Sequence, residues 1–260
     1  MATYLDRILA AHRARVAADD RDLDALVAAA AELAPARGFR SALAGAGGLG
    51  VIAEVKRRSP SKGDLAVDLD PAELAGAYAR GGAACVSVLT DVDFFGGSVA
   101  DLQAARAAVD LPVLRKDFTV DPRDVADARL MGADCVLLIA AALDDAELAR
   151  CAEVARAVGI DALVEVHDEA EAERAVAVGA DLVGVNQRDL VTFAVDTARA
   201  VRVAPQLPAG VVRVAESGIT GPADAAVLAA AGYHAVLVGE HLVRSGDPAA
   251  AVHALRSTLS

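Results

Sequence analysis

The sequence predicts a (β/α)8 barrel, and three observations carry this prediction. The chain has 260 residues, close to the roughly 250 residues that such barrels commonly contain. A glycine followed by a run of apolar residues recurs along the chain. The segments between these runs begin with residues that favour helix starts. Eight alternating strand and helix units, each roughly 20 to 35 residues long, are typical of this barrel.

An N-terminal extension precedes the barrel. Apolar residues at helical spacing predict one helix within residues 5–12 and a second within residues 23–33. Pro35 and a glycine-rich stretch then separate these helices from the first strand. We therefore expect residues 1–48 to pack on the barrel as part of a single domain that spans residues 1–260.

Eight apolar runs are predicted to form the strands. Five of them follow a glycine at the end of an alanine-rich helical stretch, where the left-handed residue that ends a helix fits. Near-continuous Val, Leu and Ile runs suit strands that are covered on both faces. In chain order, the eight runs begin at Gly50, Gly81, Pro112, Gly132, Gly159, Gly179, Val211 and Gly232.

The helices between the strands have recognisable N-terminal signals, namely a capping aspartate before a proline or a capping box. A doubly wound open sheet is the alternative architecture. It would usually carry a glycine-rich fingerprint after its first strand, and the sequence EVKRRSPS at that place is not one. Aspartate–proline starts occur at residues 70–71, 121–122 and 247–248, and capping-box pairs at Asp144 with Glu147 and Asp168 with Glu171.

Composition favours a globular protein that binds neither nucleic acid nor membranes. A hydrophobic fraction of 55% is ample for a sizeable core. The net charge of -12 disfavours nucleic acid and anionic membranes as partners, because both reward basic surfaces. The longest apolar run is far shorter than the roughly 20 residues of a membrane helix, and the N-terminus has no export signal. Three cysteines without metal-type spacing read as reduced, buried thiols. We expect a cytoplasmic protein.

Lysine is rare in this chain. Of its 25 Lys and Arg residues, only Lys56, Lys62 and Lys116 are lysine. Arginine stays protonated, whereas a desolvated lysine can lose its proton. Proton transfer and Schiff-base chemistry both use that property. Lys56 and Lys116 are therefore candidate catalytic residues, and Lys62 is either a ligand contact or a solvated side chain.

Polar residues follow most of the predicted strands, where (β/α)8 barrels carry their chemistry. Lysines and glutamates that meet at one mouth would couple and push their pKa values apart. The alternative is a layer of stabilising ion pairs, but buried pairs stabilise poorly, so we favour a functional role. The strand-end pairs are Glu54 with Lys56, Lys116 with Asp117, Glu165 with His167, Asn186 with Arg188, Glu216 with Ser217, and Gly239 with Glu240.

The last two predicted strands are followed by loops suited to phosphate. Ser217 with Gly218, and Gly239 with Glu240, lie where such barrels often bind phosphate through backbone N–H groups. Ser59, after the first strand, adds a hydroxyl to this end. A small phosphorylated molecule is thus the expected ligand.

No metal and no organic cofactor are expected. The five histidines show no paired ligand spacing, and there is no nucleotide-binding fingerprint. His167 is interpreted as a surface or capping residue. For Asp117, a catalytic role is the alternative, and the expected role is to hold Lys116 or to cap a loop.

Several of these stretches resemble the indole-3-glycerol phosphate synthase family. They include IAEVKRRSPSKG, PVLRKDFTVDP, GVNQRDLVTFAVD and AVLVGEHLVRSGDP, and together such stretches cover nearly all of the barrel. The family converts 1-(2-carboxyphenylamino)-1-deoxyribulose 5-phosphate to indole-3-glycerol phosphate. It releases CO2 and water and uses neither metal nor organic cofactor. Arg123 departs from the resemblance, because the family often has tyrosine there.

The resemblance implies a role for each strand-end residue. Lys116 would be the general acid of ring closure, with Glu165 as its carboxylate partner. Lys56 and Glu54 would bind the substrate carboxylate and assist dehydration. The remaining residues are implied as orienting groups (Asn186, Glu216 and Arg188), as the apolar wall around the anthranilate ring (Phe95, Phe118 and Leu190), and as the phosphate end (Ser59, Ser217, Gly218, Gly239 and Glu240).

Two other functions remain open from the sequence. A barrel enzyme that uses Lys116 as a Schiff-base nucleophile would need a similar set of acids. A non-catalytic binder of a phosphorylated ligand would keep the same cavity without turnover. We expect a monomer, with a weak dimer as the alternative.

Overall fold

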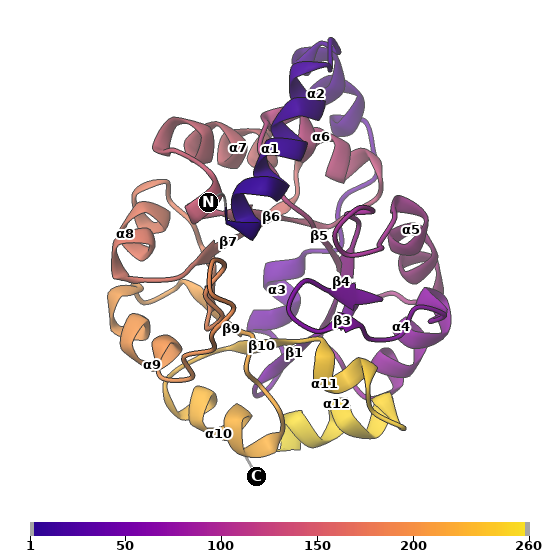
Figure 1. The fold of residues 1–260 in the computed structure, drawn as a ribbon, viewed down its shortest axis with the longest axis vertical. Coiled ribbons are helices and arrows are strands. Elements are labelled where there is room, and N and C mark those ends of the chain that lie inside the picture. The colour runs from indigo at the N-terminus through magenta and orange to yellow at the C-terminus, as the bar shows by residue number, and fades with distance from the viewer. Residues whose placement is uncertain (1–2, 258–260) are drawn as a thin grey trace.

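The computed structural model describes residues 3–257 and has the predicted barrel (Figure 1). Eight strands pair in parallel and close on themselves. Each lies within one of the eight predicted apolar runs. They are β1 (Gly50–Val55), β4 (Cys85–Leu89), β5 (Val113–Lys116), β6 (Cys135–Ile139), β7 (Asp161–Val166), β8 (Leu182–Asn186), β9 (Val212–Glu216) and β10 (Ala235–Val238).

Helices surround the barrel as an outer ring (Figure 1). The predicted aspartate caps are confirmed, because Asp70, Asp121 and Asp247 each accept a hydrogen bond from a backbone N–H of the first turn. The ring consists of α4 (Pro71–Arg80), α5 (Val99–Ala108), α6 (Pro122–Leu130), α7 (Asp145–Val158), α8 (Glu169–Ala177), α9 (Arg199–Val203), α10 (Pro222–Ala230), α11 (Glu240–Val243) and α12 (Pro248–Arg256).

One local prediction about chain geometry was wrong, and one local feature was not predicted. Gly81 has a φ of -71°, and the left-handed residue after α4 is Gly82, with a φ of 86°. An added Cβ on Gly81 would collide with the backbone of α12. Gly81 is therefore small for packing, and Gly82 makes the turn. A hairpin of two short strands, β2 (Arg58–Ser59) and β3 (Gly63–Asp64), also lies unpredicted in the loop after β1.

The N-terminal extension has three helices, α1 (Tyr4–Ala17), α2 (Leu23–Ala31) and α3 (Phe39–Ala44). The third was not predicted. Leu33 lies beyond the end of α2 and is 42% exposed, so the second predicted helix was too long. The predicted ranges 1–48 and 1–260 also include residues 1, 2 and 258–260, which lie outside the described part of the chain.

The short helix α3 closes one end of the barrel. Its Phe39 and Leu43 are fully buried with the side chains of the barrel interior. The backbone N–H of Arg40 donates to Asp161, the first residue of β7. The end where the strands begin is thus filled, and the free space lies at the end where the strands finish.

Arginine side chains fasten the extension to the ring. Arg13 donates to Glu147 at 2.7 Å, and Arg21 donates to Asp127 of α6. Arg123, the departure from the family pattern, donates to the carbonyl groups of Val16 and Asp19 near the end of α1.

In the described part of the chain, no helix is long and apolar enough to cross a membrane.

Candidate active site

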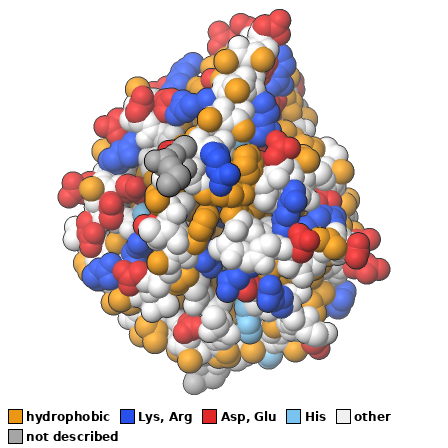
Figure 2. Space-filling view, in the orientation of Figure 1, with side chains coloured by type: hydrophobic (Ala, Val, Ile, Leu, Met, Phe, Trp, Pro, Cys, Tyr) orange, Lys and Arg blue, Asp and Glu red, His pale blue; other side chains and the backbone are white. Residues whose placement is uncertain are grey.

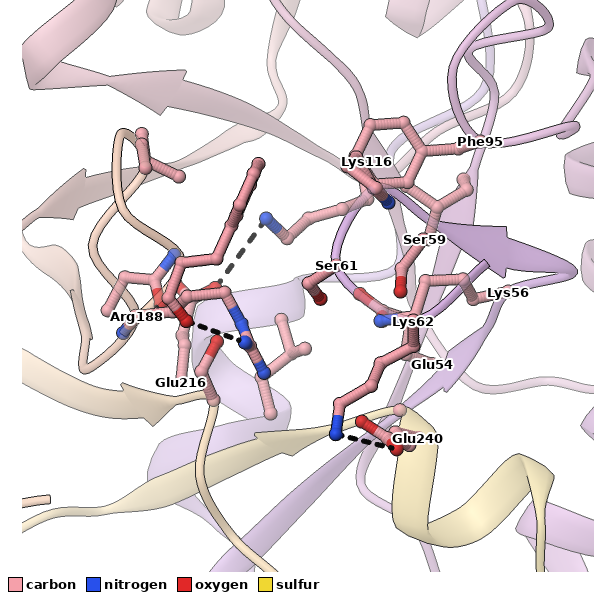
Figure 3. A pocket seen from close by; sticks show the side chains of 18 of the residues that line it. Glu54, Lys56, Ser59, Ser61, Lys62, Phe95, Lys116, Arg188, Glu216 and Glu240 are labelled. Atoms are coloured by element: carbon pink, nitrogen blue, oxygen red, sulfur yellow. Dashed lines mark hydrogen bonds and ion pairs between the residues drawn. The ribbon is translucent and has the colours of Figure 1, made fainter. Parts of the chain in front are cut away.

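A cavity of about 960 Å³ opens at the carboxyl ends of the strands. Figure 2 looks onto this face, with apolar side chains at its centre and Lys and Arg side chains around them. All of the residues predicted to form the site line this cavity, and Figure 3 labels several of them, among them Glu54, Lys116 and Glu216. Helix α1 also lines it, through Tyr4, Leu5 and Ile8. The sequence pattern marked residues 5 and 8 only as an apolar helix face.

Lys116 lies at the centre of a polar cluster. Its Nζ is 3.0 Å from Glu165 Oε2 and 3.6 Å from Glu216 Oε2. Asn186 Nδ2 donates to the other oxygen of Glu165 at 3.0 Å. These four residues end β5, β7, β8 and β9 or lie one position before the end, so strand alternation turns their side chains into the barrel.

The surroundings shift the pKa values of the two carboxyl groups, Glu165 and Glu216, in opposite directions. Burial alone would raise the pKa of Glu165, but Lys116 and His167 hold that pKa well below its usual value. Burial, followed by the charge of Glu165, raises the pKa of Glu216 to about 8. Burial alone would lower the pKa of Lys116, yet Glu165 and the other nearby carboxylates raise it. Lys116 is thus held as an ammonium group, and of the two carboxyl groups Glu165 ionises more readily than Glu216.

A second pair, Glu54 and Lys56, lies across the cavity (Figure 3). The Lys56 ammonium donates to Glu54 Oε1, and Tyr78 anchors the strand by donating to the backbone carbonyl of Glu54 at 3.0 Å. Glu54 and Lys56 lie two positions apart at the end of β1, so their side chains are on the same face of the strand, as the spacing predicts.

Two glycines make room for these carboxylates. A Cβ on Gly184 of β8 would collide with Glu216 Oε1, and a Cβ on Gly239 would collide with Glu54 Oε1 and come within 2.9 Å of Lys56 Nζ. Gly239 was predicted only for the phosphate end, and Gly184 was not predicted at all. A residue that acts by lacking a side chain leaves little signal in one sequence.

The apolar wall combines loops from different units. The rings of Phe95 and Phe118 lie with their centroids 6.2 Å apart. Leu190 packs against the same apolar cluster. Arg188, in the same loop as Leu190, has its guanidinium bonded to the carbonyl of Phe193 at 3.1 Å.

The predicted phosphate end has an unusual backbone. Ser217 has a φ of 64°, a left-handed conformation that is uncommon without glycine, and Gly218 follows with a φ of 74°. The Gln187 amide holds this turn by donating to the Ser217 carbonyl at 2.8 Å. The Glu240 carboxylate lies 3.8 Å from Lys62 Nζ. A carboxylate repels phosphate, so Glu240 can serve a phosphate only through its backbone.

His167 is not a surface residue, and that interpretation was wrong. Its side chain is 11% exposed, with Nε2 3.3 Å from Glu165 Oε1 and Nδ1 3.0 Å from Glu171 Oε2. His167 is not the cap of α8 either, because Asp168 is the N-cap. The predicted capping box of Asp168 and Glu171 forms in part: Asp168 accepts from the backbone N–H of Glu171, but Glu171 reaches back to the N–H of His167 instead of Asp168.

A buried cluster of His12, Asp91 and Asp117 has the residue types of a cation site. Both oxygens of Asp91 already accept hydrogen bonds, from His12 and from two backbone N–H groups. Both oxygens of Asp117 accept too, from Thr90, from Arg115 and from a backbone N–H. This donor set is satisfied within the protein, so the cluster serves to fasten α1 to the loops after β4 and β5. Asp117 caps its loop, one of its two predicted roles.

The fold and the cavity define a (β/α)8-barrel enzyme with a site arranged for proton transfer. The family model for indole-3-glycerol phosphate synthase matches residues 5–255. The chain is 56% identical over 256 residues to the indole-3-glycerol phosphate synthase of Nocardioides sp. (strain ATCC BAA-499 / JS614), covering 96% of each chain. It is 53% identical over 252 residues to that of Mycobacterium leprae (strain Br4923), covering 96% of this chain and 93% of the relative.

The chain therefore belongs to the indole-3-glycerol phosphate synthase family, as its sequence stretches predicted. Its activity is that of a carboxy-lyase of tryptophan biosynthesis, and the family's substrate is phosphorylated. Among solved structures, 3-hexulose-6-phosphate synthase superposes with a TM-score of 0.65 at 20% identity, covering 82% of this chain and 100% of that one. Thiamine phosphate pyrophosphorylase from Pyrococcus furiosus gives 0.60 at 17% identity, covering 81% and 94%. These two likenesses concern the fold alone.

Proposed function

We propose that Lys116 is the general acid of ring closure and that Glu165 is its carboxylate partner. The observation that carries this proposal is the 3.0 Å contact between Lys116 Nζ and Glu165 Oε2 inside the cavity. Ring closure needs a proton delivered to the substrate carbonyl oxygen as the new carbon–carbon bond forms. A buried ammonium group paired with carboxylates is a donor already held in place for that step.

Lys56 and Glu54 serve the other end of the reaction. The substrate carboxylate needs a cation, and Lys56 provides one at the mouth of an otherwise acidic protein. Dehydration after ring closure needs a proton given to a leaving hydroxyl group and another removed from carbon. The adjoining ammonium and carboxylate of Lys56 and Glu54 can supply this acid and base.

The remaining residues orient the substrate between these two pairs. Asn186 and Glu216 direct Lys116 and Glu165, with Arg188 beside them. An apolar slot holds the flat anthranilate ring in attack geometry, and the turn at Ser217 and Gly218 receives the phosphate. The slot is formed by Phe95, Phe118 and Leu190, and the rest of the phosphate end by Ser59, Gly239 and the backbone of Glu240.

Substitution of Lys116 by arginine tests this assignment. Lys116→Arg keeps the positive charge but provides a guanidinium that does not release its proton. We expect kcat to fall by at least about 100-fold. The assay measures indole fluorescence during turnover of the carboxyphenylamino-ribulose phosphate. Retention of most activity would remove Lys116 from the proton transfer.

Borohydride trapping separates this mechanism from Schiff-base chemistry. A nucleophilic lysine must be a neutral amine, whereas the carboxylates around Lys116 raise its pKa. We expect no covalent adduct when the protein is reduced with borohydride in the presence of substrate. A trapped adduct at Lys116 would favour the aldolase-like alternative.

We also propose that the chain is a cytoplasmic monomer in which extension and barrel form one domain. All of the predicted site residues line the cavity from a single chain, and the three cysteines are free thiols. Light scattering after gel filtration should give the monomer mass, and thermal unfolding should show one transition. A dimer mass would contradict the monomer, and two unfolding transitions would contradict the single domain. Recovery of the protein in a non-cytoplasmic cell fraction would contradict the cytoplasmic location.

A further inference from the structure

His167 lies directly behind Glu165, on the side away from Lys116. The imidazole sits between two carboxylates, with Nε2 facing Glu165 Oε1 at 3.3 Å and Nδ1 facing Glu171 Oε2 at 3.0 Å. His167 is not among the residues that line the cavity, but it contacts Glu165, which does line it. A chain of alternating charges thus runs from Lys116 through Glu165 and His167 to Glu171.

The start of α8 holds the imidazole in this position. Asp168 caps the helix by accepting from the backbone N–H of Glu171 at 2.8 Å. Glu171 Oε2 in turn accepts from the backbone N–H of His167 at 2.7 Å and contacts its ring. Because one carboxylate binds both the backbone and the ring of the same residue, the imidazole can rotate away from Glu165 only by giving up its bond to Glu171.

The two flanking carboxylates favour a doubly protonated ring. Nδ1 is hydrogen-bonded to Glu171 Oε2, whereas Nε2 lies at ion-pair distance from Glu165 Oε1 without an aligned hydrogen bond. A neutral imidazole has one donor and one acceptor nitrogen, so its acceptor would face a carboxylate on either side. Burial alone would lower the pKa of His167, but Glu165 and Glu171 raise it to about 10. The charged groups that face the ring are these two glutamates, and Lys116 and Glu216 lie beyond Glu165.

We propose that His167, held as an imidazolium by Glu171, is a positioning residue that keeps Glu165 ionised and turned toward Lys116. The inference rests on the proposed roles of Lys116 and Glu165. When Lys116 gives its proton to the substrate, Glu165 loses its ammonium partner inside a buried site. His167 remains as a second positive charge beside Glu165. It therefore lowers the cost of the proton's departure, which the neutral amide of Asn186 cannot do.

The protonation state can be measured without activity. Ring correlation spectra of the 15N-labelled full chain are recorded between about pH 5 and about pH 9. We expect His167 to keep the imidazolium pattern beyond about pH 8, whereas an unperturbed histidine changes near pH 6.5. Titration of His167 near that ordinary value would overturn the proposal, whatever the activity assays show.

Kinetics then test the positioning role. His167→Gln and His167→Asn should lower kcat by at least about tenfold with KM changed by less than about threefold. Loss of the positive charge lets the pKa of Glu165 rise from its depressed value, so on acidification the variants should lose kcat/KM at a higher pH than wild type does, which moves the acid limb of the profile. His253→Gln, which removes an exposed histidine from α12, is the control and should behave as wild type.

A purely structural role would lower stability without moving the acid limb. Folded His167 variants with unchanged kcat and an unmoved acid limb would therefore overturn the proposal. If they fail to fold, Glu171→Gln replaces them, because it keeps an oxygen for the His167 backbone and removes only the charge. Its acid limb should move in the same direction by a smaller amount, and an unmoved limb would again overturn the proposal. Full activity of Lys116→Arg would contradict the proposed role of Lys116. The spectra would still report the protonation state of His167, so the two failures can be told apart.

Discussion

Gly184→Ala should slow the enzyme by displacing one carboxylate. The new Cβ would lie closer to Glu216 Oε1 than the 3.0 Å limit that real Cβ contacts respect, so the carboxylate must retreat by roughly 1 Å. Its Oε2 is 3.6 Å from Lys116 Nζ. A misplacement of about 1 Å in a catalytic group can cost up to about 100-fold in rate. We therefore expect a 10- to 100-fold loss in kcat, or about 1.4 to 2.7 kcal/mol of transition-state stabilisation.

The assay follows indole fluorescence at saturating substrate, with urea unfolding in parallel. Overpacking should cost about 1 to 3 kcal/mol of unfolding free energy. Gly50→Ala is the matched control, since it adds a methyl group to a strand of the same barrel where the nearest atoms are 3.4 Å away. We expect it to retain activity.

A double variant shows whether the loss passes through Glu216. Because Gly184→Ala is expected to act by moving that carboxylate, adding it to Glu216→Gln should lower kcat little further. The reasoning fails if Gly184→Ala keeps kcat within twofold of wild type. It also fails if the losses from Gly184→Ala and Glu216→Gln simply multiply, or if Gly50→Ala loses as much activity.

Two further predictions concern stability. Arg123→Ala removes the side-chain donor of the Asp19 carbonyl and one of several donors of the Val16 carbonyl, and it should cost about 1 to 2 kcal/mol in urea unfolding. KM should rise because α1 lines the cavity, and an unchanged KM would contradict that link. The pKa of Glu216 is raised from 4.5 to about 8 in the folded protein, so its contribution to stability is full at low pH and is lost as the pH rises through about 8. Glu216→Gln should therefore gain stability relative to wild type between about pH 5 and about pH 9, and a constant difference would refute the shift.

The barrel could be predicted because its signals are local and repeated. Each strand is a short apolar run with a turn residue before it, and each aspartate cap lies next to the helix it starts. Helix α3 lacks such signals. It has six residues, follows Gly38 in a left-handed conformation, and has no side-chain cap. Phe39 and Leu43 pack there because the open end of a barrel needs filling, which is a tertiary cause.

The site was predictable as a set of strand ends but not as a network. Strand alternation indicates that Lys116, Glu165 and Glu216 face inward. It does not say that His167, just after a strand, folds back onto Glu165. That arrangement depends on which backbone N–H Glu171 selects at the start of α8, a choice between two adjacent groups that the residue pattern leaves open.

The contrast between lysine and arginine in this chain has a physical cause. All three lysines line the cavity. The arginines that fasten the fold use the guanidinium fork, as when Arg37 donates to three backbone carbonyls and Arg57 binds both oxygens of Asp101. Those positions reward several donors in a plane and a charge that never leaves. Lys116 stands among carboxylates that hold its proton until a substrate oxygen competes for it. An arginine would give that oxygen a hydrogen bond but not a proton, so the chain uses lysine where the charge has to move.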